Sequence, residues 1–403
     1  GLQGSNGLAL VNEASGAVAL TVGGNKASTT FSGSLSGTGS SLTKTGTGTL
    51  TLSGATANTY TGLTTVSDGT LKLSKTSGVN AIAGNVLVNG GKLQWGNANQ
   101  VANTASITLN SGILLTNTDT VANVTINGTN AGGQTYIHGL TITDTLTLAG
   151  GLPYLGSSTT TTANKVVMTT GGAIEMAANA GDTTMNIGGG GLSMTDAVWH
   201  LGLLGAYASP LISPDTAQIN LGGNFTGAGI SSIKYYNTNG PRLLDLQGAT
   251  RTFDITDGTT TIDATIQNGG LTKTGVGTLT LSGVNTFSGG TKVDAGILRL
   301  DNSLALQNST FDTQTGLVGT LSFGALTSAT FGGLQGANDL ALVNDSSAAV
   351  ALTVGGNDAS TTFSGSLSGT EGSLTKIGTG TLTLSGATAN TYTGTTTVSG
   401  GVL

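Results

Sequence analysis

The chain has 403 residues, a formal net charge of −6 at pH 7, 68 glycines, four prolines and no cysteine. Only 8% of the residues are charged and the 13 Lys and Arg form no run, which argues against a nucleic-acid partner because phosphate binding needs concentrated basic side chains. The absence of cysteine excludes disulfides and thiolate metal sites, and no apolar run reaches the ~18 residues of a membrane-spanning helix.

Residues 1–71 alternate small polar and apolar side chains, which is the period-2 pattern of half-buried β-strands. In residues 41–54 (SLTKTGTGTLTLSG) threonines occupy one parity, whereas the other holds Leu42, Leu50 and Leu52. Alternate residues point to opposite faces of a strand, so we expect the leucines to pack inside and the threonines to tolerate water. Asp68-Gly69 then offers a turn before the apolar parity switches.

The middle of the chain is its least regular part. All four prolines lie there, and proline cannot donate to a strand ladder, so we expect no central strand at these positions: Pro153, Pro210, Pro214 and Pro241. The same region carries Trp199, Tyr207, Tyr235 and Tyr236, which we interpret as a candidate partner-contact loop because Trp and Tyr dominate interface energetics. The alternative is a loop folded back over its own apolar side chains.

Catalytic and metal chemistry finds little support in the sequence. Asp254, Asp257 and Asp263 form the densest acidic group, but their spacing fits no known Ca²⁺ loop and Asp257-Gly258 is an ordinary turn pair. His138 and His200 lie in dissimilar contexts without ligand spacing. We therefore predict no catalytic residue, no metal site and no cofactor, and a protein that is not an enzyme; a polysaccharide lyase or hydrolase, which would need two close carboxyl groups, is the weaker alternative.

One cassette of about 30 residues occurs three times, beginning at Leu42, Leu271 and Leu374. In the second copy Leu279, Leu281 and Val293 take the places that Leu50, Leu52 and Val66 have in the first. We expect all six side chains to be buried. The same parity predicts that Thr280 faces water, so that an aspartate would be tolerated there but not at Leu281.

A longer repeat encloses the cassettes. Residues 333–403 match residues 1–71 without a gap at a constant offset of 332, with 59 of the 71 aligned positions identical and 12 different. We interpret 1–332 as one full tandem repeat and 333–403 as the start of the next; the family resemblance given below implies that the repeats form one continuous β-helix.

The cassette pattern L-x-K-x-G-x-G-x-L-x-L-x-G-x-x-T-[YF]-x-G-x-T-x-V resembles the passenger-associated transport repeat of bacterial autotransporters. In the first cassette the matching residues are Lys44, Gly46, Gly48, Leu50, Leu52, Gly54, Tyr60, Gly62, Thr64 and Val66. The resemblance implies an exported passenger, folded as a right-handed parallel β-helix, outside or on the surface of a bacterium with an outer membrane.

We therefore expect an all-β, elongated β-solenoid with 20–25 residues in each coil. Near-identical long repeats favour a structural fibre that grows by self-association or end-to-end continuation. The alternative function is a surface adhesin whose loops bind glycans or host proteins.

Overall fold

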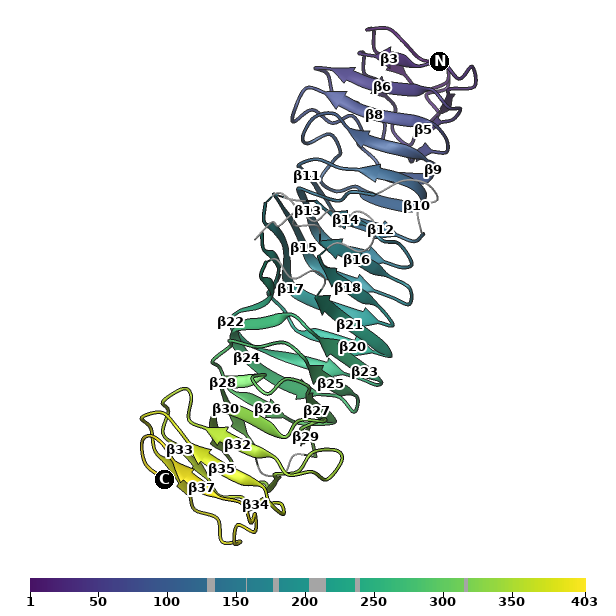
Figure 1. Cartoon of the computed structure of the whole chain (residues 1–403). Helices are drawn as coiled ribbons and strands as arrows, with labels where there is room; N and C mark the ends of the chain where they lie inside the picture. The colour runs from purple at the N-terminus through teal and green to yellow at the C-terminus, as the bar shows by residue number, and fades with distance from the viewer. Residues whose placement is uncertain (129–134, 157, 177–180, 203–214, 236–239, 315–317) are drawn as a thin grey trace. The chain divides into compact units, whose positions relative to one another are not determined.

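The structure is a computed structural model that describes residues 1–128, 135–156, 158–176, 181–202, 215–235, 240–314 and 318–403. These residues form no helix, so they include no helix long and apolar enough to cross a membrane. The chain divides into two compact units, Gly1–Gly188 with Gly202–Asp215, and Gly189–Leu201 with Thr216–Leu403. Each unit is a stack of parallel-paired strands (Figure 1), which confirms the predicted parallel β-solenoid.

Most pairings between successive coils of the first unit advance the chain by 21 or 22 residues, but Ile107 pairs with Val124, a step of 17 that falls below the predicted 20–25. Leu42 pairs with Thr64 and Thr64 with Val86, two steps of 22 residues. The strands of this unit are β1 Leu8–Ala9, β2 Ala19–Val22, β3 Thr29–Phe31, β4 Leu35–Ser36, β5 Ser41–Lys44, β6 Thr49–Gly54, β7 Thr64–Val66, β8 Thr70–Lys75, β9 Val86–Trp95, β10 Ser106–Leu115, β11 Asp119–Val121, β12 Asn123–Ile126, β13 Leu140–Leu148, β14 Tyr154–Leu155, β15 Thr159–Met168 and β16 Ala173–Met176. Pro153 and Pro241 both precede a strand, as predicted, whereas Pro210 and Pro214 lie outside the described residues.

The second unit is less even. Lys273 pairs with Val293, a step of 20 residues, but Phe225 pairs with Phe253, a step of 28 that exceeds the predicted 20–25. β17 Thr183–Thr195 contributes residues to both units. The remaining strands are β18 Val198–Leu201, β19 Ala217–Leu221, β20 Phe225–Ala228, β21 Ile230–Tyr235, β22 Arg242–Ile255, β23 Thr259–Ile262, β24 Thr265–Thr274, β25 Thr278–Leu281, β26 Thr291–Val293, β27 Ile297–Leu300, β28 Leu306–Asp312, β29 Thr320–Ser322, β30 Ser328–Gln335, β31 Leu340–Ala341, β32 Ala351–Val354, β33 Thr361–Phe363, β34 Leu367–Ser368, β35 Ser373–Lys376, β36 Leu382–Leu384 and β37 Thr396–Val398.

The inward parity forms an apolar core. The six side chains predicted to be buried are all at most 5% exposed: Leu50, Leu52, Val66, Leu279, Leu281 and Val293. The prediction for Thr280 is wrong, because its residue is only 4% exposed. Thr280 lies in the middle of β25, in register between Thr261 and Arg299 of the adjacent strands, so neighbouring residues flank it on both sides.

The lysine of each cassette lies on the inward parity and is also buried. Lys44 Nζ donates hydrogen bonds to the carbonyl oxygens of Thr45 (2.7 Å) and Gly46 (2.7 Å) and, on the next coil, of Asp68 (3.2 Å). Lys273 and Lys376 repeat this arrangement in the other two cassettes. Gly69, with φ +60°, passes so close that a Cβ there would lie 2.8 Å from Lys44 Nζ. The lysine thus fastens two successive corners, and the nearby glycine makes room for it.

The asparagine of the cassette bridges three coils. Asn58 Oδ1 accepts a hydrogen bond from Leu35 N (2.8 Å), and its Nδ2 donates to Ala81 O (2.7 Å). Asn285 makes the equivalent bonds with Ile266 N and Ala305 O. These buried amides satisfy backbone groups that the corner leaves unpaired.

Residues 333–403 fold as residues 1–71 do. The bounds of β31–β35 equal those of β1–β5 shifted by 332, and the pairing of Leu8 with Leu35 recurs as Leu340 with Leu367. β30, which leads into this second copy, pairs with β28 on one side and β32 on the other. The seam is therefore part of the strand stack of the second unit.

Candidate ligand-binding groove

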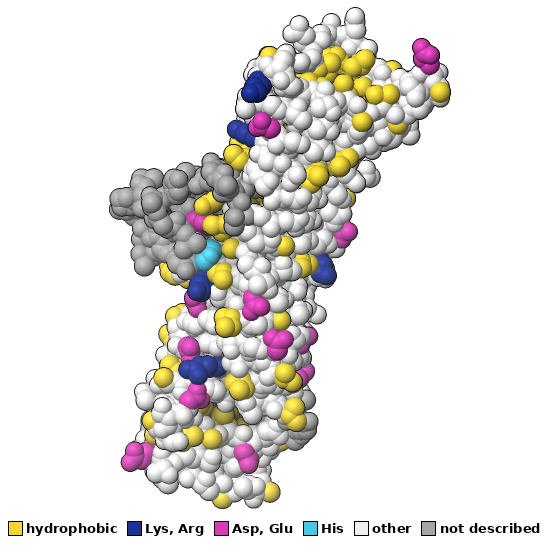
Figure 2. Space-filling view, turned by 90° about the vertical axis from the view of Figure 1, so that its right-hand side faces the viewer, with side chains coloured by type: hydrophobic (Ala, Val, Ile, Leu, Met, Phe, Trp, Pro, Cys, Tyr) yellow, Lys and Arg dark blue, Asp and Glu magenta, His cyan; other side chains and the backbone are white. Residues whose placement is uncertain are grey.

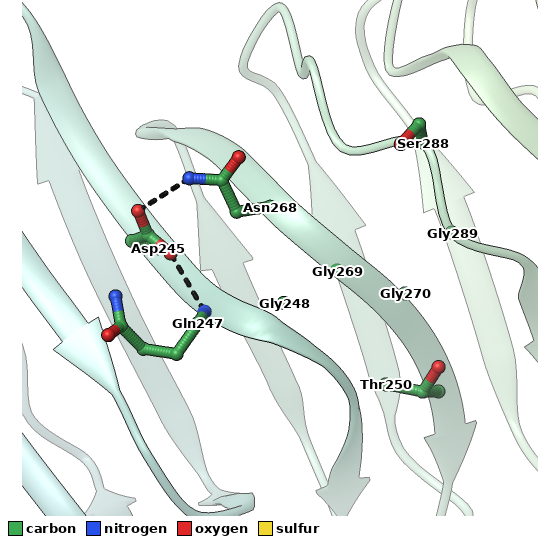
Figure 3. A pocket seen from close by; sticks show the side chains of 9 residues that line it. All are labelled: Asp245, Gln247, Gly248, Thr250, Asn268, Gly269, Gly270, Ser288 and Gly289. Carbon is green, nitrogen blue, oxygen red and sulfur yellow. Dashed lines mark hydrogen bonds between the residues drawn. The ribbon is translucent and has the colours of Figure 1, made fainter.

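A hollow opens in the second unit where β22 and β24 change register (Figure 3). Asp245 pairs with Gln267 and the next pair is Ala249 with Gly269, so β22 takes four steps where β24 takes two. The two extra residues form a bulge, which bends a strand and re-aims its side chains. The hollow has a volume of about 700 Å³ and is lined by Asp245, Gln247, Gly248, Thr250, Asn268, Gly269, Gly270, Ser288 and Gly289.

The carboxylate of Asp245 holds the wall of this hollow together. It is buried, and its Oδ1 accepts a hydrogen bond from Gln247 N (2.7 Å). Its Oδ2 accepts from Gln267 Nε2 (2.9 Å) and Asn268 Nδ2 (2.8 Å). With three N–H donors engaged, this carboxylate acts as a positioning group for the amide side chains around it.

Two non-glycine residues of the wall adopt left-handed backbone conformations. Gln247 has φ +57° and Asn268 has φ +53°. Such conformations are unfavourable for residues with a Cβ, although Asn tolerates them best, and they persist only where the surroundings enforce them. The bonds to Asp245 supply that enforcement, and Gln247 Nε2 also donates to Asn220 Oδ1 (3.1 Å). The wall is consequently preorganised.

Two further hollows continue the first, and we call the three together the groove. One of about 210 Å³ shares Thr250 with the first hollow, and one of about 330 Å³ shares Asp312 with the second and reaches Ser364. An in-register row of polar residues, one from each successive coil, follows the same course: Thr252, Thr272, Lys292, Asp312 and Gln335.

The groove is polar and nearly neutral. Among the described residues that line these three hollows, the ionisable ones are Asp245, Lys292 and Asp312, the one apolar side chain is that of Ala337, and none is aromatic. An adjoining hollow that shares Asp312 is lined instead by Phe311, Leu321 and Leu340 and is not part of the groove. Lys292 lies 3.4 Å from Asp294, and Asp312 accepts a hydrogen bond from Gln335 Nε2 (2.8 Å). Charges are also sparse and scattered on the face drawn in Figure 2. The groove can therefore offer many uncharged hydrogen-bonding groups but little electrostatic attraction.

Of the four residues proposed from sequence as a partner-contact loop, the structure describes Trp199 and Tyr235. Trp199 lies in β18, in register with Ile233, and is 0% exposed. It is therefore part of the core and does not have the exposed position that the predicted partner contact requires. Tyr235, at the end of β21, is 40% exposed and stays a candidate. Tyr207 and Tyr236 lie outside the described residues.

Asp254 and Asp257 of the acidic group accept hydrogen bonds next to the turn between β22 and β23. Asp254 accepts a hydrogen bond from Thr274 Oγ1 (3.1 Å) and Asp257 from Gly229 N (2.6 Å). Within the described ranges, no three His, Cys, Asp or Glu side chains are grouped so that they could hold a metal ion. Burial lowers the pKa of His138, and burial together with Lys234 lowers the pKa of His200 to about 4, so both imidazoles are neutral at pH 7.

Sequence reasoning missed the groove and the buried lysines for different reasons. A bulge is defined by the pairing of one strand with its neighbour, so the sequence of residues 242–255 alone cannot predict it. The burial of Lys44 was visible in principle, since it shares the parity of Leu42.

Comparison with known proteins identifies the cassettes. The family model of the passenger-associated transport repeat matches residues 42–73, 271–300 and 374–403. Over 232 residues, or 55% of the chain, the sequence is 32% identical to the protein named adhesin BmaC autotransporter of Brucella suis biovar 1 (strain 1330). The chain spans only 6% of that protein's length. No solved structure shows significant similarity to this chain.

Proposed function

Because its passenger-associated transport repeats mark the chain as part of an autotransporter passenger, we propose that it acts as a surface adhesin. Such a passenger lies outside the cell or on the surface of a bacterium with an outer membrane. The observation that carries the proposal is the similarity of 232 residues to an adhesin. Only 8% of the residues are charged, which supports binding rather than catalysis.

Adhesion can be tested directly with the chain itself. Beads coated with the purified chain are expected to attach to epithelial cells or to extracellular-matrix coatings, and soluble chain should compete for attachment. The matched control is Leu281→Asp, which places a charge in the core and should abolish the folded surface. Equal attachment by wild-type and Leu281→Asp beads, or no attachment to any surface, would refute the adhesin proposal.

A second proposal concerns length. We propose that residues 1–332 are one repeat of a longer structural fibre and 333–403 the start of the next, so that the same chain can serve as a stalk. The equal bounds of β1–β5 and β31–β35, and the pairing of β30 on both sides, support it. A protein with two joined 332-residue repeats should appear in electron micrographs as a single rod twice as long as one repeat. Two rods joined at variable angles would contradict the fibre.

A further inference from the structure

We propose that the groove binds a neutral, hydroxyl-rich oligosaccharide in an extended conformation. This inference deepens the adhesin function and rests on it, because it names the class of surface ligand.

The strands that form the groove offer a peptide ligand no free edge. A peptide that binds by strand addition needs an edge strand with free N–H and C=O groups. The strands that form the groove are each paired on both sides: β22, β24, β26, β28 and β30. Recognition must therefore come from side chains and corner groups.

The lining also disfavours apolar and highly charged ligands. An amphipathic helix needs an apolar groove, and the hollow at Asp245 contains no apolar side chain. A sulfated or uronic-acid polymer needs a basic surface, and Lys292 is the groove's one cation beside Asp245 and Asp312. What remains is a ligand that offers many uncharged hydroxyl groups.

The groups present suit such a ligand. Thr250 and Ser288 supply hydroxyls that both donate and accept, and the amide oxygen of Asn268 points away from Asp245 in Figure 3. Asp245 fixes the positions of Gln247 and Asn268 in advance, which lowers the entropy cost of binding. The groove also continues over successive coils, as an extended chain of sugars requires. Since none of the described side chains that line the three hollows carries an aromatic ring for stacking, affinity for one oligosaccharide should be weak, with a Kd of about 1 mM.

Gly290 allows the groove to be filled without disturbing the fold. It lines the groove beside Lys292, and a Cβ built there meets its nearest atom, Thr310 O, at an ordinary 3.8 Å. Gly290→Gln should therefore fold normally while its side chain obstructs the middle hollow. The matched control is Gly24→Gln in the first unit, where a Cβ meets no atom within 4 Å.

The test measures binding of the whole chain to cellohexaose, maltohexaose, a mannan hexasaccharide and, as the acidic probe, a hyaluronan hexasaccharide by saturation-transfer NMR. At least one neutral probe should bind, Gly290→Gln should weaken it at least ten-fold, and Gly24→Gln should leave it unchanged. If Gly290→Gln melts below the wild type, Thr250→Gln, which obstructs the junction of two hollows, replaces it. The proposal fails if no neutral probe binds, if the acidic probe binds better, or if the obstructing variant binds equally well.

Running the same variants in the bead assay separates the two proposals. If wild-type and Gly290→Gln beads adhere equally, the groove is not the adhesive site, and the adhesin proposal stands without it. If a neutral oligosaccharide binds but no beads adhere, the adhesin proposal is refuted and oligosaccharide binding by the groove is supported.

Discussion

The cassette lysines are single residues that solve a local problem of the coil. A solenoid corner turns several carbonyl oxygens towards the interior, where water cannot reach them, and a buried acceptor without a donor is costly. One ammonium group has three donors, and Lys273 uses them on Thr274, Gly275 and Ala295. The interior nevertheless disfavours the charged form of this ammonium group. Burial lowers the pKa of Lys273 to about 8, despite the opposing effect of Asp254.

The lowered pKa of Lys273 predicts a pH-dependent stability. Between pH 8 and about 10.5 the unfolded chain binds a proton that the folded chain has lost, so stability rises with pH in this window. The free energy of unfolding of the wild type, relative to Lys273→Met, should increase by at most about 3 kcal/mol across it. Urea unfolding of both proteins at several pH values measures this. A difference that shrinks as pH rises would mean that the carbonyl bonds outweigh burial.

The cassette tyrosine makes a second prediction for a single residue. The hydroxyl of Tyr60 shares a buried hydrogen bond of 2.6 Å with Thr64 Oγ1. Tyr60→Phe leaves Thr64 without this partner and should lower the free energy of unfolding by about 1–2 kcal/mol. In the second cassette, where Phe287 replaces the tyrosine, Thr291 Oγ1 instead bonds Ser309 Oγ at 2.8 Å.

That difference between cassettes supplies the control. Ser309→Ala should lower the free energy of unfolding by more than Tyr60→Phe, because Ser309 Oγ bonds Thr291 and also donates to Gly289 O (2.6 Å). Urea midpoints unchanged in both variants would show that these hydroxyl pairs contribute nothing.

At the scale of a strand, parity decides what a substitution does. In β6, Leu52 is 0% exposed, whereas Thr51 on the opposite parity is half-buried and lies in register with Lys72. Leu52→Asp should therefore destabilise by about 3 kcal/mol or more, because it buries an unpaired carboxylate. Thr51→Asp, facing Lys72, should change the free energy of unfolding by less than about 1 kcal/mol. Thermal unfolding of the pair tests this, and equal melting temperatures would overturn the assignment of faces.

Strand-scale features also mark the limit of reading the sequence. The alternation of Leu50 and Leu52 with threonine was enough to predict strands and their buried face, because side-chain direction has a period of two in any strand. The parallel solenoid itself was predicted from the resemblance of the cassettes to the passenger-associated transport repeat. The groove at Asp245 was beyond such reading, since a bulge is a mismatch between two coils of unequal length. Trp199 was misplaced for a related reason: its residue type favours an interface, but its register with Ile233 puts it in the core.

At the scale of the whole molecule, cohesion comes from ladders and burial rather than from charge. In the part of the chain that the structure describes, the ion pairs join Lys292 to Asp294 and Arg299 to Asp301 and Asp345, and all of these side chains are partly exposed. Arg299–Asp345 is the one that joins the first copy to the second, with a distance of 2.8 Å. Exposed pairs of this kind contribute at most about 1 kcal/mol.

The seam between the two sequence copies should therefore be as firm as the rest of its unit and insensitive to salt. β30 is bonded to β28 and to β32, and its residues Phe331 and Leu334 are 0% exposed. We expect the amides of Ser328–Gln335 to exchange with deuterium as slowly as those of β24, at 0.05 M and at 1 M NaCl alike, since salt screens charges but leaves backbone ladders intact. Arg299→Ala, which removes the ion pair at the seam, is the matched control and should leave the exchange of β30 unchanged. Fast exchange confined to β30, or protection that high salt or Arg299→Ala removes, would mean that the two copies are docked through charge and that no continuous stack crosses the seam.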